Sequence, residues 1–118
     1  MNNLEELELL VKAADSKRAE NTIVLNVREV STLADYFMIT SADSNRQVAA
    51  IADAIIEKAK ENQIEIRRIE GNRAAEWILI DLGNIVINVF QTDQRKYYNL
   101  EKLWSQAEAV ETTDWIAE

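Results

Sequence analysis

Residues 76–91 read EWILIDLGNIVINVFQ, and this stretch decides the fold. Two mostly apolar runs flank Gly83 and Asn84, a pair that suits the two-residue turn of a β-hairpin. Such a turn fixes the register, so Leu82 faces Ile85 and the pairs further out follow by counting. The stretch therefore predicts two antiparallel strands in a defined register.

This register gives the two faces of the hairpin different characters. One face carries only apolar pairs, which are Leu82 with Ile85, Ile80 with Ile87, and Ile78 with Val89. That face is predicted to lie against the core. The other face mixes large aromatic rings with polar groups, in the pairs Asp81 with Val86, Leu79 with Asn88, and Trp77 with Phe90. It is predicted to be neither plain core nor plain solvent-exposed surface.

The rest of the chain supplies helices and strands on both sides of the hairpin. Asn3 with Glu6 and Ser44 with Gln47 are spaced as capping boxes, and an apolar stripe at helical spacing follows each pair. The predicted order is a helix from residue 3 to about 19, strands at 22–27 and 36–40, a helix behind Ser44, an edge strand beginning at 64–66, the hairpin, and a short helix from about residue 100.

This order predicts an α/β or α+β fold. The hairpin is antiparallel, whereas the helix behind Ser44 allows a crossover between parallel strands, so the sheet is expected to be mixed. About five strands covered by helices are expected. Residues 1–104 are predicted to form one domain, because 118 residues are too few for two cores. Residues 105–118 carry four acids and no basic residue, and are expected to form a flexible tail.

Composition narrows the classes of function. The chain has no cysteine and no histidine, which removes thiolate metal sites and the usual general base at neutral pH. Thirteen basic residues against 21 acidic ones give a formal charge of −8, which disfavours a nucleic-acid site and suits a basic protein partner. The N-terminus does not resemble a signal peptide, and no apolar run is long enough for a membrane span. A cytoplasmic location is therefore expected, with no membrane association.

The sequence gives little support for an enzymatic function. With two glycines, the chain cannot build a glycine-rich phosphate cradle, and its aspartates offer no Asp-x-Asp pair for two-metal chemistry. Residues 41–44 stand where a strand enters a helix, a position that cradles anions in some proteins, but a helix N-cap is the better interpretation. No catalytic residue, metal or cofactor is predicted.

The aromatic residues favour a protein interface. Trp77, Phe90, Tyr97, Tyr98 and Trp104 crowd one face of the hairpin and the segment that follows it. The opposite hairpin face already supplies a surface for the core. The aromatic face can therefore be explained either by a bound partner or by a second buried layer. Tryptophan and tyrosine with charged neighbours such as Asp81 and Arg95 are typical of an interface hot spot with a polar rim.

Several short motifs resemble the ribosomal silencing factor family, also called RsfS or Iojap. They run in the same order from about residue 4 to residue 104. The motifs are Asp35-Tyr36-Phe37, Ser44-x-Arg46-Gln47, Glu70-Gly71, Trp77-x-Leu79-x-Asp81-x-Gly83, Val89-Phe90 and Arg95-x-Tyr97-Tyr98-x-Leu100-x-x-Leu103-Trp104. Two positions depart from the family pattern: Asn88 stands where the family usually has His, and Asn84 where an acid commonly follows the turn glycine. The amide of Asn88 can still donate and accept hydrogen bonds.

The resemblance implies a nucleotidyltransferase-like fold without its catalytic residues. It also implies a non-enzymatic function, in which the protein binds ribosomal protein L-fourteen on the large subunit, blocks joining of the small subunit and so represses translation. The partner-binding residues that we predict are Trp77, Leu79, Asp81, Asn88, Phe90, Arg95, Tyr97, Tyr98 and Trp104. Two alternatives stay open: a nucleotidyltransferase-like enzyme, and a homodimer formed through the same aromatic face when the partner is absent.

Overall fold

The computed structural model describes residues 2–71, 76–99, 102, 105 and 107–116. Its elements are α1 (Asn3–Ser16), β1 (Glu20–Asn26), β2 (Tyr36–Ala42), α2 (Asn45–Glu61), β3 (Arg68–Gly71), β4 (Trp77–Asp81), β5 (Ile85–Gln91), α3 (Thr92–Tyr98), β6 (Glu108–Ala109) and the 3₁₀ turn η1 (Thr113–Trp115). The strands form a six-stranded sheet in the order β3-β4-β5-β2-β1-β6.

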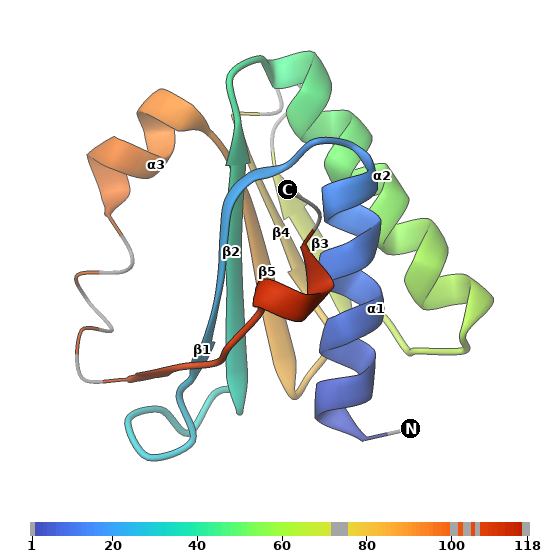
Figure 1. The fold of residues 1–118 in the computed structure, drawn as a ribbon, viewed down its shortest axis with the longest axis vertical. Coiled ribbons are helices and arrows are strands. Elements are labelled where there is room, and N and C mark those ends of the chain that lie inside the picture. Colours follow the sequence, from blue (N-terminus) through green and yellow to red (C-terminus); the bar gives the residue numbers. More distant parts are fainter. Residues whose placement is uncertain (1, 72–75, 100–101, 103–104, 106, 117–118) are drawn as a thin grey trace.

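The sheet is mixed, as predicted. β2 and β5 are parallel neighbours, and the other neighbouring pairs are antiparallel. The helices α1 and α2 cover one face of the sheet, and α3 lies on the other side, near one end of the strands (Figure 1). The predicted α/β class is therefore confirmed, with one strand more than the number expected.

The hairpin has the predicted register. Ile78 pairs with Val89, Ile80 with Ile87 and Trp77 with Phe90. The amide of Leu82 donates to the carbonyl of Ile85 at 2.9 Å, which closes the turn. Counting outward from the turn residues was thus sufficient to align both strands.

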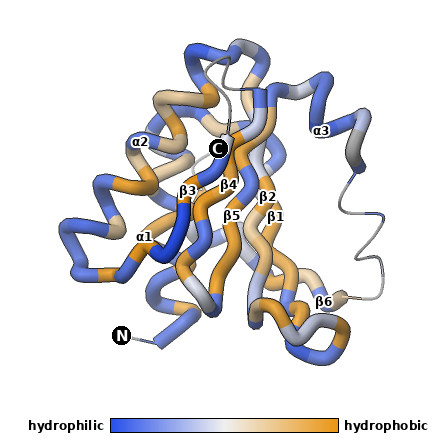
Figure 2. The backbone as a smooth tube through the Cα atoms, turned by 180° about the vertical axis from the view of Figure 1, so that it is seen from behind, coloured by the Kyte–Doolittle hydropathy of each residue, from blue (hydrophilic) through white to orange (hydrophobic). Residues whose placement is uncertain are grey.

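The main core lies between the sheet and the two long helices. The side chains of Ile80, Ile87 and Val89 are fully buried there, against the stripe of α2 that includes Val48, Ile51 and Ile55. Figure 2 shows the central strands as mostly hydrophobic and α3 as mostly hydrophilic. The predicted core face of the hairpin is therefore confirmed. None of the described helices is both long and apolar enough to cross a bilayer.

Both long helices begin at a side-chain cap. The capping box of α1 uses Asn2 and Glu5, one residue earlier than the predicted pair Asn3 and Glu6. For α2, the hydroxyl of Ser44 accepts a hydrogen bond from the amide of Gln47 at 3.1 Å, as predicted. The side-chain amide of Gln47 does not return to the cap but donates to the carbonyl of Lys17 at 3.0 Å, which ties the end of α1 to the start of α2.

Replacing Ser44 by Ala is expected to lower the free energy of unfolding by about 1 kcal/mol, because one amide at the start of α2 loses its acceptor. Ser44→Asp should keep most of the stability, because a carboxylate accepts the same hydrogen bond. Urea denaturation of the three proteins measures this difference. Equal midpoints for Ser44→Ala and the wild type would show that the cap does not stabilise the helix.

Two predicted elements were wrong in position. The edge strand does not begin at Ile64, whose amide donates to the carbonyl of Ala59 in the turn that follows α2. The strand begins at Arg68, where pairing with Asp81 starts. The last helix, α3, occupies Thr92–Tyr98, where a polar connection was expected. The helix predicted from Leu100 falls mostly outside the described residues.

The C-terminal segment crosses from one side of the sheet to the other. Ala107 packs on the face away from α1 and α2, β6 pairs with β1, and Trp115 packs against the main core. Between them, the carboxylate of Glu111 accepts hydrogen bonds from the hydroxyl and amide of Thr113, which lower its pKa. The predicted flexibility of residues 105–118 stays a prediction, although the described part of this segment contacts the domain.

Candidate functional site

The sheet has a second apolar surface on the side away from α1 and α2. Strand alternation directs onto this side the residues Ile23, Leu25, Phe37, Ile39, Trp77, Leu79, Val86, Asn88 and Phe90, which we call the second sheet face. Leu25, Val27, Ile39 and Phe90 form a buried cluster of their own there, separate from the main core. The helices α1 and α2 lie on the opposite face of the sheet, and α3 lies near one end of the strands (Figure 1). Ala107 of the C-terminal segment packs against this second face.

Two neighbouring side chains hold Trp77, which is half-buried on this face. Its ring stacks on that of Phe90, with the centroids 6.0 Å apart and the planes 7° from parallel. The indole Nε1–H donates to Oδ1 of Asn88 at 3.1 Å. Phe90 therefore fixes the plane of the indole, and Asn88 fixes the direction in which it points. A rigid aromatic side chain loses little conformational freedom when a partner binds it.

Phe90 and Asn88 lie beneath the surface rather than on it. Phe90 is 1% exposed and Asn88 is 2% exposed. A buried amide oxygen needs a donor, and the indole of Trp77 provides one. These two residues can therefore hold Trp77 in place, but they offer a partner almost no surface of their own.

Charged groups border the second sheet face on the β3 side. Leu79 is half-buried. It pairs with Asn88 on β5 and with Glu70 on β3. Asp81 accepts a hydrogen bond from the amide of Gly83 at 2.8 Å, and one carboxylate oxygen lies 3.8 Å from a guanidinium nitrogen of Arg68. This edge is therefore a polar rim next to the aromatic centre.

The helix α3 adds two of the predicted residues at the other end of the face. Nη1 of Arg95 donates to the hydroxyl of Ser41 at 3.0 Å and to the carbonyl of Glu20 at 3.4 Å. The side chain of Tyr97 is 81% exposed. Tyr98 ends α3, but its side chain and the whole of Trp104 lie outside the described residues.

The comparisons with known proteins agree on one family. The family model described as "Ribosomal silencing factor during starvation" matches residues 1–118. The chain is 50% identical over 111 residues to ribosomal silencing factor RsfS of Halalkalibacterium halodurans, covering 94% of this chain and 95% of the relative.

The chain belongs to the ribosomal silencing factor family.

A solved structure and a more distant relative extend this result. The crystal structure of a Bacillus halodurans protein, 48% identical, matches with a TM-score of 0.82 over 92% of this chain and 99% of that chain. The mouse protein named mitochondrial assembly of ribosomal large subunit protein 1 is 29% identical over 103 residues, covering 85% of this chain and 45% of that longer protein. A ribosomal silencing factor has a regulatory role rather than a catalytic one.

Sequence reasoning missed part of the aromatic and aliphatic surface of this ribosomal silencing factor. Phe37 and Ile39 on β2, with Ile23 and Leu25 on β1, continue the surface across the sheet. A signal for them was present, because β1 and β2 are apolar at successive positions and such strands have apolar side chains on both faces. The sequence predicted strands at 22–27 and 36–40 but did not assign their side chains to a face.

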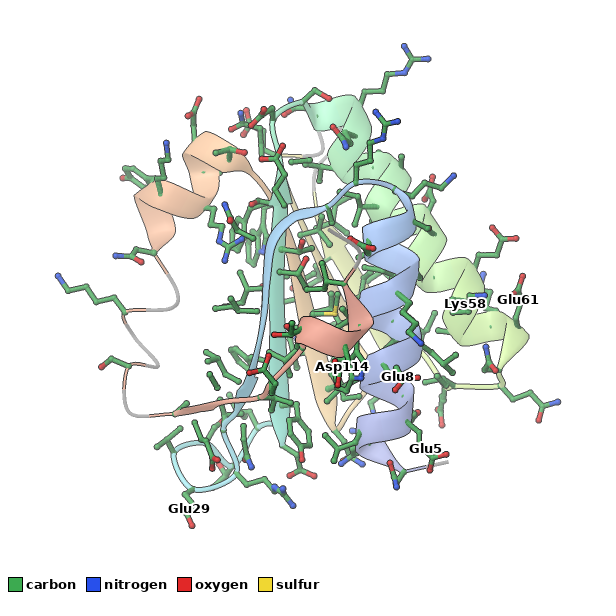
Figure 3. All side chains as sticks on the ribbon, in the orientation of Figure 1. Glu5, Glu8, Glu29, Lys58, Glu61 and Asp114 are labelled. Atoms are coloured by element: carbon green, nitrogen blue, oxygen red, sulfur yellow. The ribbon has the colours of Figure 1, made fainter. Side chains whose placement is uncertain are left out.

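Acidic side chains of this ribosomal silencing factor are spread over its surface. Of the acids labelled in Figure 3, Glu5 and Glu8 lie on α1, Glu61 ends α2 and Asp114 lies in η1, whereas Glu29 lies in the loop between β1 and β2. Glu8 and Glu61 form ion pairs with lysines of their own helices at 3.2 and 3.5 Å. In the described part of the chain, no group of three or more His, Cys, Asp or Glu side chains is placed to hold a metal ion.

Proposed function

We propose that this ribosomal silencing factor binds ribosomal protein L-fourteen of the large subunit through the second sheet face. In this proposal, Trp77, Leu79 and Tyr97 contact the partner, Asp81 and Arg95 form the polar rim, and Asn88 and Phe90 hold Trp77 in position. Tyr98 and Trp104 complete the proposed set. The bound domain then blocks joining of the small subunit and represses translation.

The observation that carries this proposal is the partly exposed aromatic surface over the buried cluster of Leu25, Ile39 and Phe90. Hot spots of protein interfaces are enriched in Trp and Tyr that pack on a firm support and are ringed by polar groups. Trp77 has such a support in Phe90 and Asn88. The charged edge formed by Arg68 and Asp81 supplies part of the ring.

The negative net charge of the chain supports the proposal of a basic partner. The formal charge of −8 creates an attractive field for a basic ribosomal protein, which raises the rate of encounter. The repression itself requires no chemical step, because a bound domain excludes a second body from the same space. Affinity and occupancy therefore determine the strength of the effect.

A subunit-joining experiment tests the proposed function. Large subunits incubated with the protein should fail to form whole ribosomes when small subunits are added, as measured by sucrose-gradient sedimentation. Purified L-fourteen should bind the protein in calorimetry. Unchanged joining at saturating protein, or no heat of binding with L-fourteen, would contradict the proposal.

Tyr97→Ala is expected to weaken binding to L-fourteen by tenfold or more, which corresponds to roughly 1.4 kcal/mol or above. The melting temperature should hardly change, because an 81% exposed side chain stabilises the fold little. Leu4→Ala is the matched control, since Leu4 is 47% exposed on α1 and outside the proposed surface. Calorimetry that gave the same affinity for both variants would exclude Tyr97 from the interface.

A further inference from the structure

A second candidate site lies where β2 and β5 end. These neighbouring strands are parallel, so their carboxyl ends meet at the same edge of the sheet. The chain continues from β2 into α2 on one face and from β5 into α3 on the other, as Figures 1 and 2 show from opposite sides. Connections that diverge in this way leave a crevice between them, and α/β sheets commonly bind ligands at that point.

A pocket of about 290 Å³ occupies this position. The residues that line it are Asn21, Ser41, Thr92, Arg95, Lys96 and Asn99. Two are cationic and the other four carry neutral hydrogen-bonding groups, and the described lining includes no acid. The hydroxyl of Ser41 donates to the carbonyl of Glu20, and that of Thr92 donates to the carboxylate of Asp43 at 2.9 Å. The guanidinium, the ammonium and the amides of the lining suit an anion that has several acceptor oxygens.

Arg95 is already held in place at this pocket. Its Nη1 donates to the hydroxyl of Ser41 and to the carbonyl of Glu20, and Ser41 itself is 1% exposed. The hydroxyl of Ser41 in turn donates to the same carbonyl at 3.2 Å. A guanidinium that hydrogen bonds already hold in place loses less side-chain entropy when it binds an anion.

Three other polar side chains of the pocket make no hydrogen bond or ion pair with the described part of the chain. They are those of Asn21, Lys96 and Asn99. Asn21 and Asn99 also have left-handed backbones, with φ of 51° and 48°. Asparagine adopts this conformation more readily than most residues, and Asn99 does so as the C-cap of α3. Within the described part of the chain, their amides and the Lys96 ammonium therefore lie at the rim of one pocket with no partner.

We propose that this pocket binds a phosphate group. Its volume lies near the ~300 Å³ lower limit of small-molecule sites, so it suits one phosphate rather than a whole cofactor. Lys96 and Arg95 would neutralise the charge, and the asparagine amides would donate to the remaining oxygens. A mononucleotide and an RNA strand are the two sources of such a group. The argument for this pocket does not use the proposed binding of L-fourteen, although Arg95 belongs to both sites.

An NMR titration of the isolated protein tests the site, with inorganic phosphate, AMP and a short single-stranded RNA as separate probes. Saturable shifts of the Ser41, Thr92 and Lys96 amides are expected. Lys96→Glu should weaken binding roughly tenfold, the effect of losing about one charge-assisted contact. Lys12→Glu is the control, because it changes the net charge equally on an exposed position of α1.

The probes distinguish the sources of the phosphate. Tighter binding of AMP than of RNA at the same amides would identify a nucleotide site, and tighter binding of RNA would identify a contact to an RNA backbone. Either result supports the proposal. Absence of saturable shifts with all three probes would overturn it. Equal weakening by Lys96→Glu and Lys12→Glu would also overturn it, because diffuse charge attraction would then explain the binding.

Discussion

Replacing Ile80 by Ala is expected to lower the free energy of unfolding by about 2–5 kcal/mol, because the substitution opens a cavity in the main core. Ile80 is fully buried on β4 and belongs to the cluster between the sheet and the two long helices. Domains of this size are stable by only ~5–15 kcal/mol, so the loss is a large fraction of the total. Urea denaturation monitored by circular dichroism measures it.

The chain offers a matched control for this experiment. Ile69 pairs directly with Ile80 across β3 and β4, but it is 49% exposed. Ile69→Ala removes the same atoms from the neighbouring strand and should change the stability by less than about 1 kcal/mol. Comparable losses for the two variants would contradict the assignment of Ile80 to a core that Ile69 only borders.

The hairpin could be predicted because its information is local. Gly83 and Asn84 fix the turn, the side-chain period of two then assigns every residue to a face, and one face contains only apolar residues. The structure has this register and places Ile80, Ile87 and Val89 in the core. Ser44 and the stripe behind it were equally predictable, since a cap and a helical period agree with each other.

The positions of β3 and α3 could not be predicted, because the sequence pattern does not mark where these two elements begin. All four residues of β3 are largely exposed, so no alternation of apolar and polar residues marks the strand, and pairing with β4 alone defines it. The helix α3 starts after Gln91, whose side chain accepts hydrogen bonds from the amides of Asp93 and Gln94. Glutamine is not among the usual N-cap residues, so the start of α3 could not be recognised.

The sequence predicted on which face of the hairpin the candidate residues lie, but not how deeply each of them is buried. The register placed Trp77, Leu79, Asn88 and Phe90 on one side of the hairpin, yet it could not show that β2 lies beside β5 and buries two of them. That burial follows from a parallel pairing between segments almost fifty residues apart. The roles proposed for Asn88 and Phe90 therefore changed from contact to support, which makes Trp77 the decisive residue.

Trp77→Ala is expected to weaken binding to L-fourteen by more than tenfold, since truncation of an interface tryptophan commonly costs ~2 kcal/mol or more. The variant should stay folded. It uncovers Phe90 and leaves the buried oxygen of Asn88 without its indole donor, so a stability loss of about 1–3 kcal/mol accompanies the change. Thermal melts and calorimetry on the same sample measure the two effects separately.

Trp77→Phe separates the contact from the hydrogen bond. A phenyl ring can keep the stacking on Phe90 but cannot donate to Asn88. If the ring surface carries the binding energy, Trp77→Phe should retain most of the affinity that Trp77→Ala loses. If the direction of the indole matters, both variants should bind weakly, although Trp77→Phe should lose less stability than Trp77→Ala because its ring still covers Phe90. Trp77→Ala binding as tightly as the wild type would instead remove this face from the interface, because the tryptophan proposed to be its central contact would then contribute nothing.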